Sequence, residues 1–479
     1  MRGADRTCDD GGMSGADDSC LGDLDDERAQ VIRAAGSTDL DLSTAGLYLD
    51  SLPRSRFASV AYQRDHGRPY IQPRGGFPGW AQQRALTVAL HRAGADFIPL
   101  TIDSHTRHND YATAGKLLEA GNAERRDLLN GYPLVSHGFA RTRELYEGVD
   151  VPVSLRHGTP DARLLTEVAL ASGITEIEGG GLCYTLPYAK SYPIDRALMH
   201  WQYVDRLCAL VGPADAPIHR ESFGPLTATL VPPVTTVVIQ LCELLLAAEQ
   251  GVRSFAVSFG QTGSFEQDVA IARVLRRQAA RLLAHFGHRD VRIGLVYHQW
   301  MGAFPTEPTL AWQLIAVSAA LSRLVGADKV VVKTPEEAIG VPRIESNADA
   351  VRAVRYVLDM FPDAAPLSSE VIDEEDDLID GEVTEVMEHV LHQATGSLLA
   401  AVHRCVVSGV VDVPFAPHEQ NAGRLLTDRG PGRRIRILSP GAVPLSPAHL
   451  RRERELLGAR PDERSMLWER LLRDVRILA

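Results

Sequence analysis

Three arginines stand in the sequence where loops or strand ends are expected, and together they suggest a ligand with carboxylate groups. Arg74 lies in the segment PRGGFP at 73–78, where two glycines allow close approach of the backbone to a ligand. Arg107 and Arg156 each follow a short apolar run. A guanidinium matches a carboxylate in bidentate fashion, so three converging arginines would suit a substrate with two negative charges. Surface ion pairing is the alternative for each arginine taken alone.

A second group of functional side chains follows at 178–188, in the sequence EGGGLCYTLPY. Glu178 ends an apolar run, where it could bind an ammonium group or act as a general base. The three glycines after it predict an open loop where a large ligand can approach the backbone. Tyr184 and Tyr188 could add hydroxyl donors. The alternative is a flexible loop with a solvated Glu178.

Two other segments carry reactive side chains. The segment DSHTRHND at 103–110 has the histidines and aspartates of a metal hydrolase, but no second such cluster follows at a later strand end, so we predict no metal site. Lys333, in the last predicted strand, could form a Schiff base as in aldolases. Glu337 would share a side with Lys333 and Val341, or serve only to cap the helix that Thr334 begins.

The elements that must position these residues alternate along the chain. From about residue 95, short apolar runs are followed by helical patterns, of which 265–286 is a clear example because its apolar residues recur at helical spacing. Eight such units predict an α/β protein with a (β/α)8 TIM barrel, and an open doubly wound sheet is the alternative. The predicted strands are 96–101, 133–137, 151–156, 174–178, 217–222, 254–259, 292–298 and 329–333. The clearest predicted helices are 161–172, 194–211, 265–286, 309–325 and 347–361.

The predicted strand ends gather charged and aromatic residues on one side of this barrel. Catalytic groups of such barrels sit at the C-terminal ends of the strands and in the loops after them. A purely structural set of residues would have no reason to collect there. The residues concerned are Arg107, His137, Arg156, His157, Glu178, Glu221, Phe223, His298 and Lys333.

The barrel does not account for the whole chain. Residues 1–38 begin with an acidic stretch poor in apolar side chains, which predicts a disordered leader. We assign 39–361 to the barrel with an N-terminal extension, and 362–479 to a smaller appended α+β domain. Within the latter, an acidic run at 370–380, interpreted as a solvated helix face, leads into a helix near 383–404.

Composition excludes several classes of protein. The chain has 479 residues, 45% hydrophobic and 23% charged, as is typical of a soluble globular protein. A formal net charge of -12 argues against nucleic-acid binding. The apolar stretch 226–248 contains two prolines, Gln240 and Glu243, so we expect no membrane span; we also expect no signal peptide, because the N-terminus lacks an apolar core segment. Six scattered cysteines favour the reducing cytoplasm.

Ten segments, in order, are similar to the epsilon subunits of glutamate mutase, also called methylaspartate mutase. The resemblance runs from about 39 to 440. The segments are QPRGG (72–76), TIDSHTR (101–107), LLNGYP (128–133), RHGTPDARLL (156–165), EGGGLCYTLPYAK (178–190), RESFGPLTATLVPP (220–233), LLAAEQGV (245–252), HQWMGAFP (298–305), KVVVKTPEEAIGVP (329–342) and GVVDVPFAP (409–417).

The resemblance implies a (β/α)8 barrel enzyme that interconverts L-glutamate and L-threo-3-methylaspartate by a radical rearrangement through a glycyl fragment and acrylate. Its cofactor is adenosylcobalamin (coenzyme B12), held between the barrel mouth and a separate sigma subunit. A homodimer of this chain is implied within a two-plus-two heterotetramer. The sigma subunit carries the cobalt-binding Asp-x-His-x-x-Gly motif. Here the glycine position after Asp103 and His105 is His108, so the motif is missing, as the family predicts.

The family's functional residues transfer to matching positions of this sequence. The substrate-binding set that the resemblance implies is Arg74, Arg107, Arg156, His157, Glu178, Tyr184 and Tyr188, with Glu178 receiving the substrate ammonium and acting in catalysis. The implied cofactor-binding set is Gly76, Asn130, Pro187, Phe304, Lys333, Glu337 and Val341, where the family has isoleucine at the last place. A Schiff-base lyase that uses Lys333 is the alternative function.

Overall fold

A computed structural model describes residues 17–34, 40–64, 66–226, 230–362, 367–458 and 467–479, which fall into two units, Met1–Asp41 and Leu42–Ala479. In the first unit, α1 (Asp17–Ala34) is a helix, where the composition predicts disorder over 1–38. Leu24 of this helix is buried. The rest of that predicted leader, 1–16 and 35–38, lies outside the described residues.

The second unit is built on eight parallel strands in the order β1-β8-β7-β6-β5-β4-β3-β2. The strands are β1 (Tyr70–Gln72), β2 (Ile98–Thr101), β3 (Val153–Arg156), β4 (Glu176–Glu178), β5 (His219–Glu221), β6 (Ser254–Gly260), β7 (Arg292–His298) and β8 (Lys329–Val331). Backbone hydrogen bonds connect the chain at β1 with the chain at β2, the two strands at the ends of this order. The amide of Asp96 donates to the Ile71 carbonyl at 3.0 Å, and the amide of Thr101 donates to the Gly75 carbonyl at 3.0 Å. The predicted (β/α)8 barrel is therefore confirmed.

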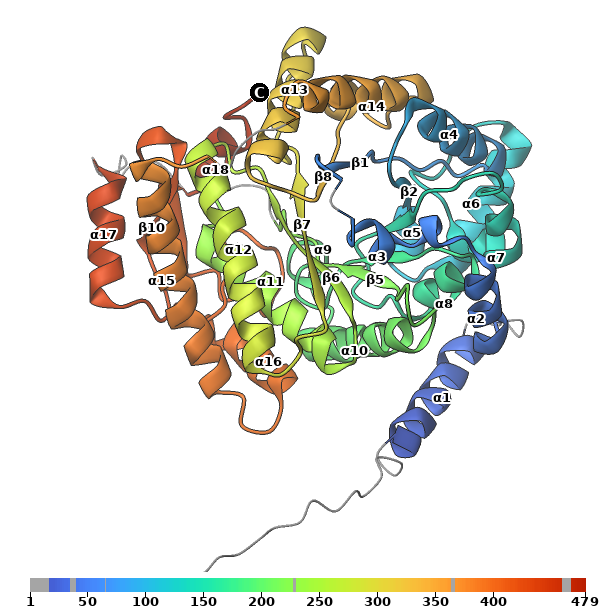
Figure 1. Cartoon of the computed structure of the whole chain (residues 1–479), viewed down its shortest axis with the longest axis horizontal. Coiled ribbons are helices and arrows are strands. Elements are labelled where there is room, and N and C mark those ends of the chain that lie inside the picture. Colours follow the sequence, from blue (N-terminus) through green and yellow to red (C-terminus); the bar gives the residue numbers. More distant parts are fainter. Residues whose placement is uncertain (1–16, 35–39, 65, 227–229, 363–366, 459–466) are drawn as a thin grey trace, which may run out of the picture. The chain divides into compact units, whose positions relative to one another are not determined.

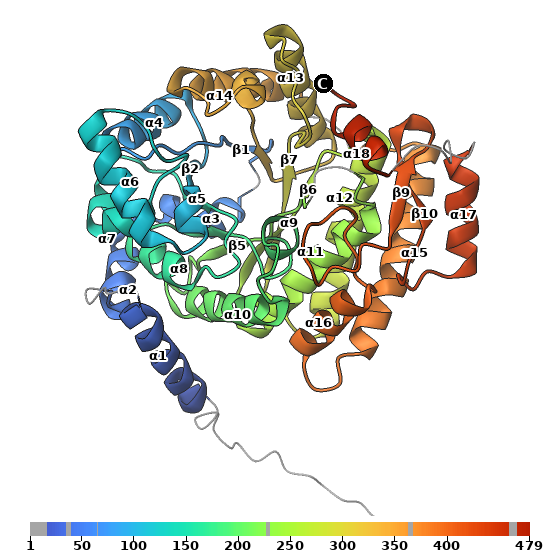
Figure 2. The ribbon, with the colours of Figure 1, turned by 180° about the vertical axis from the view of Figure 1, so that it is seen from behind.

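Helices surround these strands, as Figure 1 and, from behind, Figure 2 show. The five helices that the sequence pattern predicts most clearly are all present. They are α8 (Arg163–Ala171), α10 (Ile194–Leu210), α12 (Phe265–His285), α13 (Pro308–Leu324) and α14 (Ile344–Asp359). The others before α15 are α2 (Leu42–Ser51), α3 (Ala58–Ala61), α4 (Trp80–Ala93), α5 (Ser104–Arg107), α6 (Tyr111–Glu124), α7 (Leu134–Glu144), α9 (Thr185–Tyr188) and α11 (Pro233–Glu249).

One predicted strand is wrong and one real strand was missed. Residues 134–137 of the segment 133–137 form the start of helix α7, and Pro133 directly precedes this helix. The only strand-like pairing that the described residues make near this segment is an isolated bridge between Tyr132 and Ile102. The first strand is instead β1, whose three buried residues pair with β8. It is too short to show the alternation or length by which strands are read from sequence. Arg107 consequently follows the second strand of the barrel rather than the first.

The apolar stretch predicted not to span a membrane lies mostly in α11. Nearly every side chain of α11 is buried, because the helix contacts β6 on one side and α12, α15 and α16 on others. A helix that is apolar on all faces is expected in such a position. Among the described residues, no helix is both long and apolar enough to cross a bilayer.

The C-terminal part has the predicted mixed composition of elements. It comprises α15 (Glu370–His392), α16 (Leu398–Ser408), β9 (Leu426–Arg429), β10 (Ile435–Ser439), α17 (Pro447–Leu457) and α18 (Leu467–Val475). The acidic run opens α15, but it is not simply a solvated face. Glu375 is buried against Arg436, and Asp376 pairs with Arg277 of α12 at 2.9 Å. The boundary at 362 stays a prediction, since α15 packs along α12 of the barrel.

Candidate active site

A cavity of about 290 Å³ opens at the C-terminal ends of the strands. All seven residues of the predicted substrate-binding set line it. The complete lining is Arg74, Thr101, Ser104, Arg107, His108, Arg156, His157, Gly158, Glu178, Tyr184, Tyr188, Phe223, His298 and Met301. Because these residues come from widely separated parts of the chain, the barrel fold is what brings them together.

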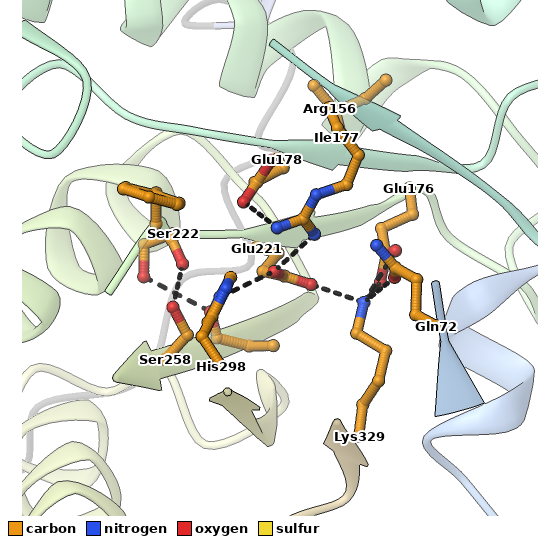
Figure 3. A network of polar contacts seen from close by, with 12 residues as sticks. Gln72, Arg156, Glu176, Ile177, Glu178, Glu221, Ser222, Ser258, His298 and Lys329 are labelled. Carbon is orange, nitrogen blue, oxygen red and sulfur yellow. Dashed lines mark hydrogen bonds and ion pairs between the residues drawn. The ribbon is translucent and has the colours of Figure 1, made fainter. Parts of the chain in front are cut away.

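Arg156, at the end of β3, lies on the floor of this cavity between two carboxylates. Its Nη1 donates to Glu221 Oε1 at 3.0 Å, and its Nη2 donates to Glu178 Oε1. All three side chains are buried, so each charge depends on the others for compensation. Figure 3 shows the guanidinium between the two glutamates. From its position at a strand end, Arg156 is expected to be free to bind a substrate carboxylate. In the structure it is already paired with two carboxylates of the protein.

Glu178, at the end of β4, receives two donors. Besides Arg156, the Tyr184 hydroxyl donates to its Oε2 at 2.6 Å. Burial raises the pKa of Glu178 to about 7; Arg156 opposes this increase and Glu221 adds to it. A carboxyl group with that pKa changes protonation state near neutral pH, which suits a group that receives an ammonium ion or exchanges a proton.

The glycines after Glu178 are packed against protein rather than open to a ligand. A Cβ on Gly180 would lie 2.4 Å from Glu243 Oε1. That carboxylate, on α11, accepts the amides of Leu182 at 2.7 Å and Cys183 at 3.0 Å. The prediction of an open, ligand-facing loop is therefore wrong. Gly180 leaves room for Glu243, which anchors the segment that carries Tyr184.

Arg107 differs from Arg156 in its partners. Its Nε donates to the Ile102 carbonyl at 2.6 Å, and no carboxylate pairs with it in the part of the chain that is described. Asp103 fixes the backbone at this point, because its side chain accepts the amides of His105 and Thr106 at the start of α5. Arg107 therefore faces the cavity with an uncompensated charge, and burial lowers its pKa.

A second group of charged side chains extends from the cavity to the loop that follows β8. Arg74 Nη1 donates to Glu337 Oε1 at 2.9 Å, and Lys333 Nζ donates to the same oxygen at 2.6 Å. Burial, followed by the charge of Arg74, lowers the pKa of Lys333 to about 8. Glu337 lies in a 3-10 turn (Pro335–Ala338) without a side-chain cap at Thr334, so the interpretation of Glu337 as a capping residue is wrong.

The other predicted cofactor residues have mixed surroundings. Phe304 is buried, with its ring 5.6 Å from Lys333 Nζ. Asn130 Oδ1 accepts the Ser104 amide at 2.9 Å, and a Cβ on Gly76 would meet the Thr101 carbonyl at 2.2 Å.

The remaining two residues of the set, Val341 and Pro187, lie at or beside exposed positions. Val341 is 56% exposed and the nearby Ile339 is 76% exposed. Pro187 lies in α9, next to the exposed side chain of Tyr188. Exposed apolar side chains beside the Lys333–Glu337 pair fit a large ligand that combines an apolar ring with hydroxyl groups.

Metal binding has a geometric candidate in the described residues: ligand atoms of Glu178, Glu221 and His298 lie within 4.8 Å of one another. Arg156 already supplies a cation to both carboxylates, so the cluster is compensated without a metal. In the segment 103–110, three side chains of metal-ligand type have structural contacts: His105 pairs with Asp110 at 3.5 Å, and the Asp103 side chain accepts the amides of His105 and Thr106.

One residue expected at the strand ends lies elsewhere. His137 is on α7, where its Nε2 contacts the Pro78 carbonyl at 2.8 Å, and it does not line the cavity. Its assignment there followed from the wrong strand at 133–137.

Beneath the cavity lies a group that sequence reasoning did not assign. Lys329 of β8 donates to Gln72, Glu176 and Glu221 at 2.5 to 2.8 Å, and all of these side chains are buried (Figure 3). A signal was present, because charged residues such as Lys329 and Glu176 are unusual in strands buried on both faces. Their partners were not visible, since they are distant in sequence.

Comparison with known proteins gives a consistent result. The model of the family described as Methylaspartate mutase E chain (MutE) matches residues 52–479. The chain is 39% identical over 455 residues to the glutamate mutase epsilon subunit of Desulfitobacterium hafniense, covering 94% of both chains. It is 40% identical to that of Treponema denticola, covering 85% of both, and 40% identical to that of Halobacterium salinarum, covering 90% of this chain and 89% of the relative.

Proposed function

Because the chain belongs to the methylaspartate mutase E chain family, we propose that it is the catalytic epsilon subunit of a glutamate mutase, an isomerase that interconverts L-glutamate and L-threo-3-methylaspartate. The observation that carries this proposal is the cavity, where an uncompensated Arg107 and a buried Glu178 lie together. A substrate with two carboxylates and an ammonium group needs receptors of both signs in one place.

Each charge of the substrate has a matching receptor. Arg107 and Arg74 offer positive charge for the carboxylates, and Arg156 contributes the N–H groups that do not face its two glutamates. Of the three buried carboxylates Glu176, Glu178 and Glu221, Glu178 is the one that lines the cavity, which makes it the receptor for the ammonium group. Tyr188, His157 and Tyr184 complete the walls.

The cavity also limits the access of water. Tyr184, Phe223 and His157 are at most 7% exposed, and Tyr188 packs against the rings of Tyr184 and Phe223. A reaction that breaks and remakes a carbon–carbon bond needs its fragments held in place and shielded from solvent. Arginines at the carboxylates and Glu178 at the ammonium would restrain both fragments at once.

The family relationship implies adenosylcobalamin and a second subunit. When bound, this cofactor supplies the radical that starts the rearrangement. Lys333, Glu337 and Phe304 would hold it on the polar side, and Val341 and Pro187 at the exposed apolar edge, with Asn130 and Gly76 nearby. The exposed edge also suits a cobalamin-carrying sigma subunit, in a two-plus-two assembly built on a homodimer of this chain.

The alternative lyase function is less well supported. Lys333 has a lowered pKa, as a Schiff-base lysine requires, but it does not line the cavity and its Nζ is bonded to Glu337. Borohydride in the presence of substrate would trap a Schiff base on Lys333. We expect no such adduct, and its detection by mass spectrometry would favour the lyase.

Reconstitution tests the mutase function directly. The chain alone should be inactive, whereas its mixture with a cognate sigma subunit and adenosylcobalamin should convert L-glutamate to methylaspartate. Addition of glutamate should also produce a cob(II)alamin signal in electron paramagnetic resonance. Arg107→Met serves as the control, since it removes the uncompensated charge and should abolish both responses. Absence of both in the complete mixture would contradict the proposed function.

A further inference from the structure

Glu221 occupies a central place in the buried ion network without reaching the cavity. It ends β5 and is fully buried. Its Oε1 lies 3.0 Å from Arg156 Nη1, and its Oε2 lies 2.5 Å from Lys329 Nζ. Arg156 and Glu178 line the cavity, whereas Glu221 does not. Any effect of Glu221 on a bound substrate must therefore pass through a neighbour that lines the cavity: Arg156, Glu178, or His298, whose Nε2 lies 3.8 Å from Glu221 Oε1.

Lys329 holds Glu221 in a fixed position. Besides Glu221, its ammonium contacts both carboxylate oxygens of Glu176 at 2.8 Å and Gln72 Oε1 at 2.6 Å. These partners come from β1, β4 and β5, so the ammonium is anchored across the barrel interior (Figure 3). A carboxylate bonded to such an anchor through one oxygen presents its other oxygen in a defined place, here to Arg156.

Because the Arg156 guanidinium binds two different carboxylates, it uses only one of its terminal nitrogens on Glu178. A guanidinium facing a single carboxylate forms a bidentate pair through two parallel bonds. In this structure one Nη is held by Glu221 and only the other reaches Glu178. Glu178 thus keeps coordination capacity for another donor. If Glu221 released Nη1, Arg156 could turn onto Glu178 with both nitrogens and occupy the place that an ammonium group needs.

We propose that Glu221 is a positioning residue that keeps Arg156 from closing on Glu178, so that Glu178 stays available to the substrate ammonium. The inference rests on the proposed function for the identity of that ammonium. The geometry of the three residues is independent of it. Glu221 is not a catalytic residue in this scheme, because it touches neither the cavity nor the substrate.

The chain provides a matched control in Glu176. Like Glu221, Glu176 is fully buried at a barrel strand and bonded to Lys329, but it makes no bond to Arg156. Glu221→Gln and Glu176→Gln each remove one buried negative charge from the same lysine with little change in shape. A role in charge balance alone predicts the same effect for both. A positioning role predicts an effect on substrate binding for Glu221 only.

The test compares the reconstituted complexes of the wild type, Glu221→Gln and Glu176→Gln. For Glu221→Gln we expect KM for L-glutamate to rise by about tenfold, the cost of one charge-assisted bond. The acid limb of kcat/KM should move to lower pH, because Glu178 gains a bidentate arginine and loses a neighbouring negative charge. Glu176→Gln should leave KM within about twofold of the wild type. Neither KM nor the position of the limb depends on the fraction of folded enzyme.

A third variant guards against loss of folding in Glu221→Gln. Glu221→Asp keeps the charge but is one methylene shorter, so it cannot bridge Arg156 and Lys329. Its KM should rise as in Glu221→Gln. Unchanged KM in either Glu221 variant, or equal changes in the Glu221 and Glu176 variants, would overturn the proposal.

Crystal structures of the same variants separate this inference from the proposed function. Arg156 should face Glu178 with both terminal nitrogens in the Glu221 variants and keep its present position in Glu176→Gln. If Arg156 moves in this way while the wild-type complex is inactive toward glutamate, the proposed function fails and the positioning role stands. If Arg156 does not move, the positioning role is overturned whatever the activity.

Discussion

Arg74 and Glu337 are joined by a hydrogen bond of 2.9 Å although 263 positions separate them in the sequence. The same carboxylate oxygen accepts Lys333 at 2.6 Å. Burial acts in the opposite direction, but Arg74 and Lys333 together lower the pKa of Glu337. One oxygen therefore couples an arginine of the cavity to a lysine of the proposed cofactor edge, so that a change at Glu337 should affect both ligands.

Replacement of Glu337 tests this coupling. Glu337→Gln removes the charge that Arg74 and Lys333 share, so both cations lose their preferred position. We expect KM for glutamate and Kd for adenosylcobalamin to rise together, each by about tenfold. Steady-state kinetics and cofactor titration of the reconstituted complex measure the two constants. The control is Glu336→Gln, whose carboxylate pairs with Arg343 instead and should change neither constant. A rise in only one constant would argue against coupling.

Glu178 should impose a pH dependence on the reaction. Its pKa is raised to about 7, so its carboxylate is present above this pH and is lost as the pH falls through it. We expect kcat/KM for glutamate to decrease on the acid side of pH 7. Glu178→Gln should lack this limb and lower kcat by about 100-fold, with a smaller change in substrate binding. Equal losses in kcat and binding would remove Glu178 from the chemistry.

Lys333 should act in the opposite pH range. Burial and Arg74 lower its pKa to about 8, so its positive charge is present below this pH and disappears as the pH rises through it. We expect the affinity for adenosylcobalamin to weaken above pH 8. An arginine stays charged throughout this range, so Lys333→Arg should give a flat profile. Spectroscopic titration between pH 6 and 10 distinguishes the two, and a wild-type profile without a break near 8 would contradict the prediction.

The glycine segment makes a prediction about stability. Gly180→Ala would place a methyl group 2.4 Å from the Glu243 carboxylate, which must then give up its bonds to the amides of Leu182 and Cys183. We expect a loss of about 2 kcal/mol in the free energy of unfolding, measured with urea. Gly46→Ala in helix α2 is the control. Its added methyl has no neighbour within 4 Å, so stability should be unchanged or rise by up to about 1 kcal/mol. Similar effects at both positions would show that Gly180 is not specifically constrained.

The sequence predicts the parts of this molecule that depend on local pattern. The strand ending at Arg156 and the helix at 265–285 follow from periodicity, and the barrel rule then places Arg156 and Glu178 at one end. The three-residue strand Tyr70–Gln72 has no such pattern, because it depends on pairing with β8, more than 250 positions away. Conversely, the run at 133–137 is apolar enough for a strand, yet the barrel already has its eight strands without it.

The partners of the site residues could not be predicted. Glu221 and Arg156 were both expected at strand ends, but only the closure of the barrel brings them to 3.0 Å. The glycines at 179–181 are a related case. Glycine permits close approach without identifying the approaching group, and here these groups belong to the protein itself: Glu243 at Gly180, Tyr184 and Trp201 at Gly179, and Leu198 at Gly181.

The shared ions beneath the cavity restrict how the sequence can diverge. Lys329 serves Gln72, Glu176 and Glu221 at once, so its replacement alone would leave the buried carboxylate of Glu176 without its cation and Glu221 with Arg156 alone. Substitutions of Lys329 and of the acidic residues bonded to it should therefore occur together in the same lineage. Positions 72, 176, 221 and 329 are expected to covary as one group, whereas the exposed positions 339 and 341 have no part in this network and can change independently of it.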